Sequence, residues 1–262
     1  MSSVSRTTTG PLVGARNLAR REAATWWSTG RWRVHALAWT LILAGLLAAM
    51  LWVFPASMDE MQTATGDSQV RDLVRQFPDL AAVVIAVGVV LLTQGLLLDE
   101  QRNGVLEWLL SKPLTRPAVI LAKFVGHALG LVATVVVLPW LVIHALLSLA
   151  DGGLWSPTRG LAVVGLLALV VVFHLALVLL LSTLTQSRVA VLAIPIVAVV
   201  SADGVTGLVP EAVHVLPWSL GPIASVVLAD GILLTGWPIL ATVAWTALLL
   251  LLAALRLQRV EL

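Results

Sequence analysis

Cysteine is absent from the 262 residues, and charged side chains are scarce. Without a thiol the chain can form no disulfide, supply no thiolate nucleophile and build no cysteine-based metal site. Asp, Glu, Lys and Arg make up 11% of the residues, whereas a soluble domain is usually about a quarter charged. The pI is near 9.9, but the net charge of +2 is too small to indicate nucleic-acid binding.

Catalytic and nucleotide-binding motifs are also missing. The sequence contains no G-x-x-x-x-G-K-[ST], no H-E-x-x-H and no G-x-S-x-G, so it offers no phosphate-cradling loop, zinc-protease helix or nucleophile elbow. No two His residues lie four positions apart, the spacing that a zinc-binding helix needs. We therefore predict a chain that is not catalytic by itself and binds no cofactor or metal. Any ATP that drives it must bind to another polypeptide.

Long apolar runs dominate what is present, since 59% of the residues are hydrophobic and the mean hydropathy is +0.99. A bilayer span needs about 20 apolar residues, and it must be helical because unpaired backbone groups are not tolerated in lipid. We predict an all-α membrane protein with six transmembrane helices, at 34–54, 80–98, 118–150, 160–181, 189–209 and 236–255. Asp203, Gly204 and Gly207 interrupt the far end of the fifth run.

The basic residues predict the orientation, because cytoplasmic segments of membrane proteins carry an excess of Lys and Arg. With the N-terminus inside, 13 of the 16 Lys and Arg residues are cytoplasmic and three are outside. The three are Arg71, Arg75 and Arg159. We expect a multi-pass protein of the cell membrane with both termini in the cytoplasm. Residues 1–33 would be a basic cytoplasmic N-terminus, and 34–262 a single six-helix domain with Asp99–Arg116 in the cytoplasm.

Asp99–Arg116 holds six of the chain's thirty charged residues and lies between two apolar runs. If Glu100–Ser111 is a helix, it carries one apolar patch with charged flanks, and Pro113 ends it. The patch consists of Val105, Leu106, Leu109 and Leu110. Such a helix could dock into a groove on a soluble partner or lie on the lipid surface. Composition alone favours neither interpretation.

The same residues carry a resemblance to a known family. The order Glu100-x3-Gly104-Val105-Leu106-Glu107-x-Leu109-Leu110-Ser111-x-Pro113-x2-Arg116-x6-Lys123 is similar to the signature loop of type-2 ABC transporter permeases. The family usually has Thr where Val105 stands, which is a mild departure. The six-helix plan, the basic amphipathic start and the broken segment before the last helix extend the resemblance across nearly the whole chain.

The resemblance implies a permease subunit that dimerises, with itself or with a similar chain, and works with two copies of an ATPase subunit. ATP and magnesium would bind to the ATPase. The loop would be the cytoplasmic coupling helix between the second and third spans, which transmits ATPase movement. The coupling residues so implied are Glu100, Arg102, Gly104, Leu106, Glu107, Leu109, Leu110, Ser111, Pro113 and Arg116.

The stretch ARNLARREAATWWSTGRWRV predicts an amphipathic helix along the inner leaflet, because Trp favours the membrane interface and Arg is attracted to anionic lipid. Its apolar side would be Leu18, Ala19, Ala23, Trp26 and Trp27, and its polar side Arg16, Arg20, Arg21 and Glu22. The resemblance implies the same element and places it near the ATPase. A membrane anchor alone explains the composition equally well.

Two glycines and a proline predict how the third span packs. Gly126 and Gly130 form a small-xxx-small step, which lets another helix approach closely. Pro139 is expected to kink the helix.

Pro210–Trp237 is apolar, but its apolar parts are too short to span a bilayer. Irregular backbone at membrane depth is tolerated only against protein or a wet cavity. We expect short helices that dip into the outer leaflet, as in the re-entrant element that the resemblance implies, or alternatively a surface loop. Polar groups at membrane depth are functional candidates, although a lone His often only hydrogen-bonds a neighbouring helix. The candidates for a pathway or gate are Gln94, His144, His174, Pro217 and Trp218.

The favoured function is ATP-driven export of a hydrophobic or amphipathic substrate, which combines the direction implied by the family with the apolar helices. One alternative is a permease similar to those for copper-site maturation of nitrous-oxide reductase, for which the outer Met58, Met61 and His214 offer soft or imidazole ligands. Another is a non-transporting membrane scaffold that recruits a cytoplasmic partner. The expected partners are lipid, the ATPase, a second permease copy and, as an option, an accessory extracellular protein, but no nucleic acid.

Overall fold

The structure, a computed structural model, describes residues 12, 14–53, 66–112, 114–151, 155–233 and 235–259. Within these residues every regular element is a helix, so the predicted all-α class is confirmed. The α-helices are α1 Ala15–Ser28, α2 Arg31–Ala48, α4 Gly66–Thr93, α5 Leu98–Arg102, α6 Val105–Leu110, α7 Arg116–Leu131, α8 Leu138–Asp151, α9 Pro157–Leu184, α10 Arg188–Val200, α11 Ala202–Leu208, α12 Leu220–Asp230 and α13 Trp237–Gln258. Two π-helical turns, η1 Ala49–Val53 and η2 Val132–Val137, and two 3-10 helices, η3 Pro210–His214 and η4 Pro217–Ser219, complete the set.

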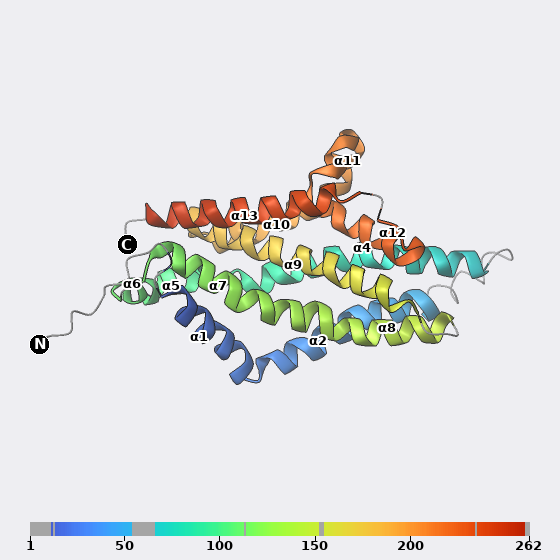
Figure 1. Cartoon of the computed structure of the whole chain (residues 1–262), viewed down its shortest axis with the longest axis horizontal. Coiled ribbons are helices and arrows are strands. Elements are labelled where there is room, and N and C mark those ends of the chain that lie inside the picture. Colours follow the sequence, from blue (N-terminus) through green and yellow to red (C-terminus); the bar gives the residue numbers. More distant parts are fainter. Residues whose placement is uncertain are drawn as a thin grey trace, which may run out of the picture.

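Five of the described helical stretches are long and apolar enough to cross a membrane. They are Arg31–Val53, Val74–Arg102, Arg116–Ala150, Pro157–Leu184 and Trp237–Gln258. Each overlaps one of the predicted spans. The length and composition of these helices therefore indicate a multi-pass membrane protein. The helices form a single elongated bundle (Figure 1).

The predicted fifth span, 189–209, is not one continuous helix. α10 has 13 residues, which is about 20 Å of helix against a hydrocarbon thickness of about 30 Å. At its end the Ser201 hydroxyl donates to the carbonyl of Val197 at 2.7 Å, so a side chain satisfies a terminal carbonyl. The chain then turns, and α11 projects away from the bundle (Figure 1). Among the described residues, five helices are therefore long enough to span a bilayer, and the sixth predicted span is not confirmed.

α9 is the central helix of the bundle (Figure 1). Its sequence is apolar on every side, a pattern typical of a buried helix, and 67% of its most apolar stretch is buried, against 28–50% in the other four. Val171 and Leu175 of α9 belong to the same buried cluster as Ile85 of α4 and Leu228 of α12. The core therefore surrounds α9.

The outward faces of α2 and α13 are apolar and exposed in the single chain. Val34, Leu37 and Leu41 recur at helical spacing on α2, and Leu240 and Leu251 are exposed on α13. Monomeric soluble proteins rarely expose large contiguous apolar patches. Such faces fit contact with lipid or with another membrane subunit.

The predicted distortion at Pro139 is present as a π-helical turn. η2 ends two residues before this proline, and α8 continues the helix. Proline has no N–H, and its ring conflicts with the carbonyl of the residue four positions earlier, here Val135. A widened turn at that place relieves the conflict.

Pro210–Trp237 contains η3, η4 and α12 rather than a simple surface loop. α12 lies beside α4 and α9 at the end of the bundle opposite α5 and α6 (Figure 1). Polar contacts hold it there. The backbone N–H of Asp79 donates to the Ser225 hydroxyl at 3.2 Å, and the Arg159 guanidinium donates to the Ala229 carbonyl at 2.6 Å.

α1 packs along the first half of α7, and glycines make this approach close. A Cβ placed on Gly126 would lie 2.5 Å from Cβ of Glu22 and 3.2 Å from the backbone oxygen of Ala19. A Cβ on Gly130 would lie 2.6 Å from the ring of Trp26. The close helix approach predicted at these two glycines is therefore present, and the partner is the N-terminal helix.

We expect Gly126→Ala to lower the free energy of unfolding by about 1–3 kcal/mol, because the added methyl would meet backbone atoms of α1. Gly165→Ala on α9 is the matched control. Nothing lies within 4 Å of a Cβ at Gly165, so the higher helix propensity of alanine should make that variant neutral or slightly more stable. The measurement is thermal unfolding of both purified variants in one detergent. Equal midpoints would contradict the close packing of α1 on α7.

Candidate functional site

Asp99–Arg116, which we call the coupling segment, lies at one end of the bundle beside the start of α7 and the end of α13 (Figure 1). The prediction of one helix over Glu100–Ser111 is wrong, because α5 ends at Arg102 and α6 begins at Val105. Between them Gly104 has φ +69°, a left-handed conformation that costs an L-residue about 1–2 kcal/mol. The glycine of the signature thus separates two short helices.

The apolar patch predicted to dock on a partner is divided by the fold. Leu106 and Leu109 are buried in a cluster that α7, α9 and α13 complete. Leu110 is half-buried and packs against the same cluster, whereas Val105 is 40% exposed. The patch therefore packs against α7, α9 and α13 of the same chain, and most of it is not available to a partner.

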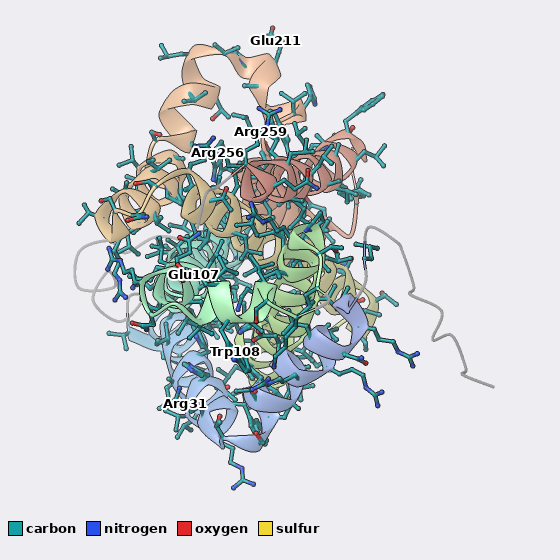
Figure 2. All side chains as sticks on the ribbon, turned by 90° about the vertical axis from the view of Figure 1, so that its left-hand side faces the viewer. Arg31, Glu107, Trp108, Glu211, Arg256 and Arg259 are labelled. Carbon is teal, nitrogen blue, oxygen red and sulfur yellow. The ribbon has the colours of Figure 1, made fainter. Side chains whose placement is uncertain are left out.

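The opposite side of α6 faces outward. Trp108 is 53% exposed, and Lys112 Nζ lies 3.5 Å from the centroid of its ring, a cation–π contact. Glu107 is exposed, and its carboxylate has no hydrogen bond or ion pair within the described part of the chain. Figure 2 shows Glu107 and Trp108 near the middle of this end of the molecule. We call Val105, Glu107, Trp108, Ser111 and Lys112 the exposed edge.

Lys123 of α7 holds the coupling segment from within. Its side chain is 1% exposed, and Nζ lies 2.7 Å from Oε1 of Glu100 and 3.2 Å from Oε1 of Glu22. A buried ammonium is tolerated only when it is paired and hydrogen-bonded. Because the two carboxylates come from α5 and α1, three segments meet at one charge. We call Lys123, Glu22 and Glu100 the buried ion cluster.

Glu22 was expected to face water beside the arginines of α1, and the structure corrects this. α1 packs on α7, so Glu22 points inward to Lys123. His127 lies next to the cluster. Its Nδ1 donates to the carbonyl of Lys123 at 3.0 Å, since a carbonyl can only accept. Its Nε2 lies 3.8 Å from Oε2 of Glu22, which is too far for a hydrogen bond.

Two arginines tie the coupling segment to other helices. The Arg116 guanidinium donates to the carbonyls of Leu257 at 3.0 Å and Gln258 at 2.9 Å. These are terminal carbonyls of α13, where a cation is favoured by the helix dipole. Arg102 donates to the carbonyl of Gln186 at 2.6 Å, in the connection between α9 and α10. The segment is therefore attached to α1, α7, α13 and the α9–α10 connection.

The ten coupling candidates thus fall into different environments. Leu106 and Leu109 are inside, and Glu107 and Ser111 are on the exposed edge. Glu100, Arg102 and Arg116 make contacts within the chain. Pro113 lies outside the described residues.

The sequence interpretation missed two groups of residues at this site. Trp108 is exposed on α6, whereas Leu106 and Leu109 are buried, and Lys112 follows the end of that helix at Leu110. Because Trp108 and Lys112 are four positions apart, helical spacing could have identified them as a pair. The pairing of Glu22 with Lys123 spans 101 positions, and no local pattern indicates it.

Three of the five pathway candidates meet in one cavity. His174 of α9 and Pro217 and Trp218 of η4 line a space of about 50 Å³, together with Asp79 of α4, which is room for roughly one or two water molecules. His174 Nδ1 donates to the carbonyl of Val170 at 2.8 Å. Nε2 of His174 and Nε1 of Trp218 are buried without a hydrogen-bond partner. These two cavity-lining residues therefore offer one free acceptor and one free donor.

Gln94 and His144 lie apart from that cavity. Gln94 follows α4, and its Nε2 donates to the carbonyl of Leu91 at 3.2 Å. His144 is half-buried on α8, close to Gly160 of α9. The five candidates do not line a common space within one chain. In the described parts of the sequence no group of three His, Asp or Glu is placed to hold a metal ion.

The model of the family described as ABC-2 family transporter protein matches residues 31–219, which include the whole coupling segment. Among curated proteins, the probable ABC transporter permease protein NosY of Stutzerimonas stutzeri is 29% identical to this chain over 121 residues, 46% of its length. The match covers 41% of that protein, so the chain spans about two fifths of this relative.

We expect Lys123→Met to destabilise the protein by about 3–5 kcal/mol, because two carboxylates would be left at a mostly buried site without a counter-charge. Asp99→Asn is the control. It breaks the ion pair of Asp99 with Arg188, whose side chains are about half exposed, and such pairs contribute at most about 1 kcal/mol. Thermal unfolding of both variants tests this.

Adding Glu22→Gln and Glu100→Gln to Lys123→Met should recover much of the lost stability, since a neutral trio leaves no uncompensated charge. A Lys123→Met variant that unfolds at the same temperature as Asp99→Asn would show that the buried ion cluster does not hold these segments together.

Proposed function

This chain belongs to the ABC-2 family of transporter proteins, and we propose that it is a permease subunit that couples ATP hydrolysis on a separate ATPase subunit to translocation of a hydrophobic or amphipathic substrate. The observation that carries the proposal is the exposed edge. An indole, an unpaired carboxylate and an ammonium project from a segment whose other side is fixed to the bundle. Tryptophan is enriched at the centres of protein interfaces, and polar or charged side chains surround such centres at the rim.

The attachments of the coupling segment suit the transfer of movement. A force on the exposed edge would act on the buried ion cluster, and through it on α1 and α7. Through Arg116 and Arg102 it would also act on the end of α13 and the α9–α10 connection. An ATPase that moves when it binds ATP could thereby shift the ends of several helices at once.

In the assembly that we propose, two copies of the chain, or this chain and a similar one, each bind one ATPase through the exposed edge. Both termini and the coupling segment are cytoplasmic, as the distribution of Lys and Arg predicts. α10 would form the sixth crossing, although it is short, and α11 would lie outside the bundle. ATP and magnesium bind to the ATPase, because these 262 residues contain no phosphate-cradling loop.

The opposite end would contain the outer gate. α12 is a short helix packed against α4 and α9, and η4 is a single turn packed against α9 and α13. Pro217 and Trp218 of η4 line the cavity beside His174. We propose that α12 and η4 move when the pathway opens outward, and that transport is export. The apolar helices suit a lipid-like or amphipathic substrate better than a sugar or a free ion.

The likeness to the permease NosY favours the copper-site alternative only weakly, and no observation favours the scaffold. For copper-site maturation, Met58 and Met61 lie outside the described residues, and His214 is exposed with no metal-ligand group around it in the described part. A non-transporting scaffold would use the same exposed edge, so the experiment below must separate binding from ATP turnover.

Trp108→Ala is the sharpest test of the proposal. We expect it to weaken the complex with the co-expressed ATPase by roughly tenfold or more, the effect typical of a central interface tryptophan, and to reduce chain-dependent ATP hydrolysis in parallel. Trp237→Ala is the matched control, because this tryptophan is 69% exposed at the start of α13. It should leave both properties unchanged. Co-purification and ATPase rates in proteoliposomes provide the readouts.

Unchanged binding and turnover in Trp108→Ala would contradict coupling through the exposed edge. The scaffold would be favoured instead if Trp108→Ala lost binding to the ATPase and if the rate of ATP hydrolysis were the same with and without the unchanged chain.

A further inference from the structure

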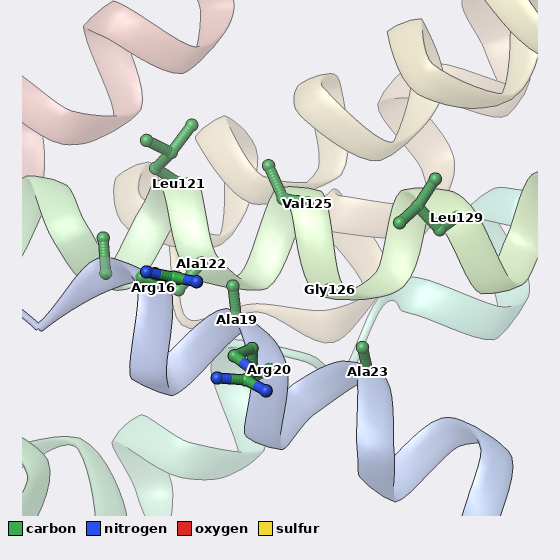
Figure 3. Close-up of a pocket in the computed structure, with 10 residues that line it drawn as sticks. Arg16, Ala19, Arg20, Ala23, Leu121, Ala122, Val125, Gly126 and Leu129 are labelled. Atoms are coloured by element: carbon green, nitrogen blue, oxygen red, sulfur yellow. The ribbon is translucent and has the colours of Figure 1, made fainter.

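A groove runs between α1 and α7, and residues of both helices line it (Figure 3). Its volume is about 360 Å³. One wall comes from α1 and the other from α7. The α1 wall is Ala15, Arg16, Ala19, Arg20 and Ala23, and the α7 wall is Leu121, Ala122, Val125, Gly126 and Leu129.

The α1 wall carries two positive charges that nothing in the described chain neutralises. Arg16 and Arg20 are one helical turn apart, both border the groove (Figure 3) and both are exposed. Neither guanidinium has a hydrogen bond or ion pair with another described residue. The only carboxylate of α1, Glu22, is bound to Lys123, and α7 contains no Asp or Glu. Like charges at this spacing destabilise a helix slightly, and an anion between them would remove the repulsion.

The α7 wall is apolar and open to the outside. Val125 is 42% exposed and Leu129 is 66% exposed. Leu121, Val125 and Leu129 follow one another along the same side of α7 (Figure 3), over about 12 Å of helix. Gly126 lies in the floor of the groove, where α1 packs closely against α7.

The two walls together are complementary to an anionic amphiphile. α1 and α7 run in parallel from the end of the bundle that carries the coupling segment (Figure 1), since Gly126 lies against Ala19 and Glu22, and Gly130 against Trp26. The arginines are therefore at that end, and the apolar wall extends toward the middle of the bundle. A guanidinium pairs well with phosphate oxygens in a two-pronged geometry.

We propose that this groove binds an anionic phospholipid of the inner leaflet, with its phosphate between Arg16 and Arg20 and an acyl chain along Leu121, Val125 and Leu129. The membrane orientation in this proposal rests on the proposed function. The bound lipid holds α1 against α7, where α1 supplies Glu22 to the buried ion cluster. Lipid composition therefore acts on the same three-segment junction that fixes the coupling segment.

The test is native mass spectrometry of the full chain in detergent, titrated with phosphatidylglycerol or with phosphatidylcholine of identical acyl chains. We expect phosphatidylglycerol to bind at least roughly tenfold more tightly. Arg16→Gln with Arg20→Gln should lower its affinity by roughly tenfold or more, as expected for two basic residues at a lipid surface. Glutamine keeps the helix propensity of α1, and circular dichroism of the variant checks that the fold is retained.

Arg21→Gln with Arg31→Gln is the matched control, because it removes the same charge from exposed arginines that do not line the groove. It should change the affinity for phosphatidylglycerol by less than about twofold. Equal losses in the two double variants, or equal binding of the two lipids, would overturn the proposal. So would displacement of the lipid by glycerol phosphate at the same concentration, which would indicate a site for soluble phosphate compounds.

The lipid measurement uses the permease chain without the ATPase, so its outcome is separate from that of the coupling test. Trp108→Ala is expected to retain full lipid affinity. If the chain did not select phosphatidylglycerol but Trp108→Ala still lost ATPase coupling, only the lipid proposal would be rejected. If the chain selected phosphatidylglycerol but Trp108→Ala kept ATPase coupling, only the coupling proposal would be rejected.

Discussion

The ammonium group of Lys123 is buried at the end of the bundle, and this constraint determines how the coupling segment and α1 are placed. A buried charge needs counter-charges, and here they come from Glu100 and Glu22, which belong to segments on either side of α7. The ion pairs fix where these two segments meet. Leu106, Leu109 and Leu18 pack in one apolar cluster, and this cluster shields the end of the bundle from water. Polar and apolar contacts therefore specify the same arrangement.

This arrangement gives the coupling segment two different sides. The inner side is occupied by the chain's own helices, and the outer side leaves Trp108, Glu107 and Lys112 exposed. A flexible loop could bind an ATPase but would transmit little displacement. A segment held by buried charges and by Arg116 at the end of α13 would carry displacement into several helices. The division at Gly104 turns α6 so that both conditions are met.

Much of this organisation could be predicted from the sequence, because apolar length and basic-residue counts depend on local composition. The five long apolar helices followed from apolar length, whereas the signature of the coupling segment came from its resemblance to the family. What could not be predicted depends on geometry or on distant pairing. Gly104 breaks the expected helix through a positive φ, and Glu22 turns inward because Gly126 lets α1 approach. α10 ends at Val200, and for this break the sequence did give a signal, because Asp203, Gly204 and Gly207 interrupt the fifth apolar run. The outward position of Trp108 could have been inferred from its spacing to Leu106, but Lys123 could not be assigned its partners.

The central claim is that the exposed edge contacts an ATPase on the cytoplasmic side of the membrane. Site-specific photo-crosslinking from position 108 tests it most directly, with benzoylphenylalanine in place of Trp108 so that an aromatic side chain is kept. In intact cells the account predicts an adduct with the mass of this chain plus one ATPase subunit, with a yield that changes when nucleotide hydrolysis is blocked. Adducts with lipid alone, or with proteins on the outer side of the membrane, would contradict it.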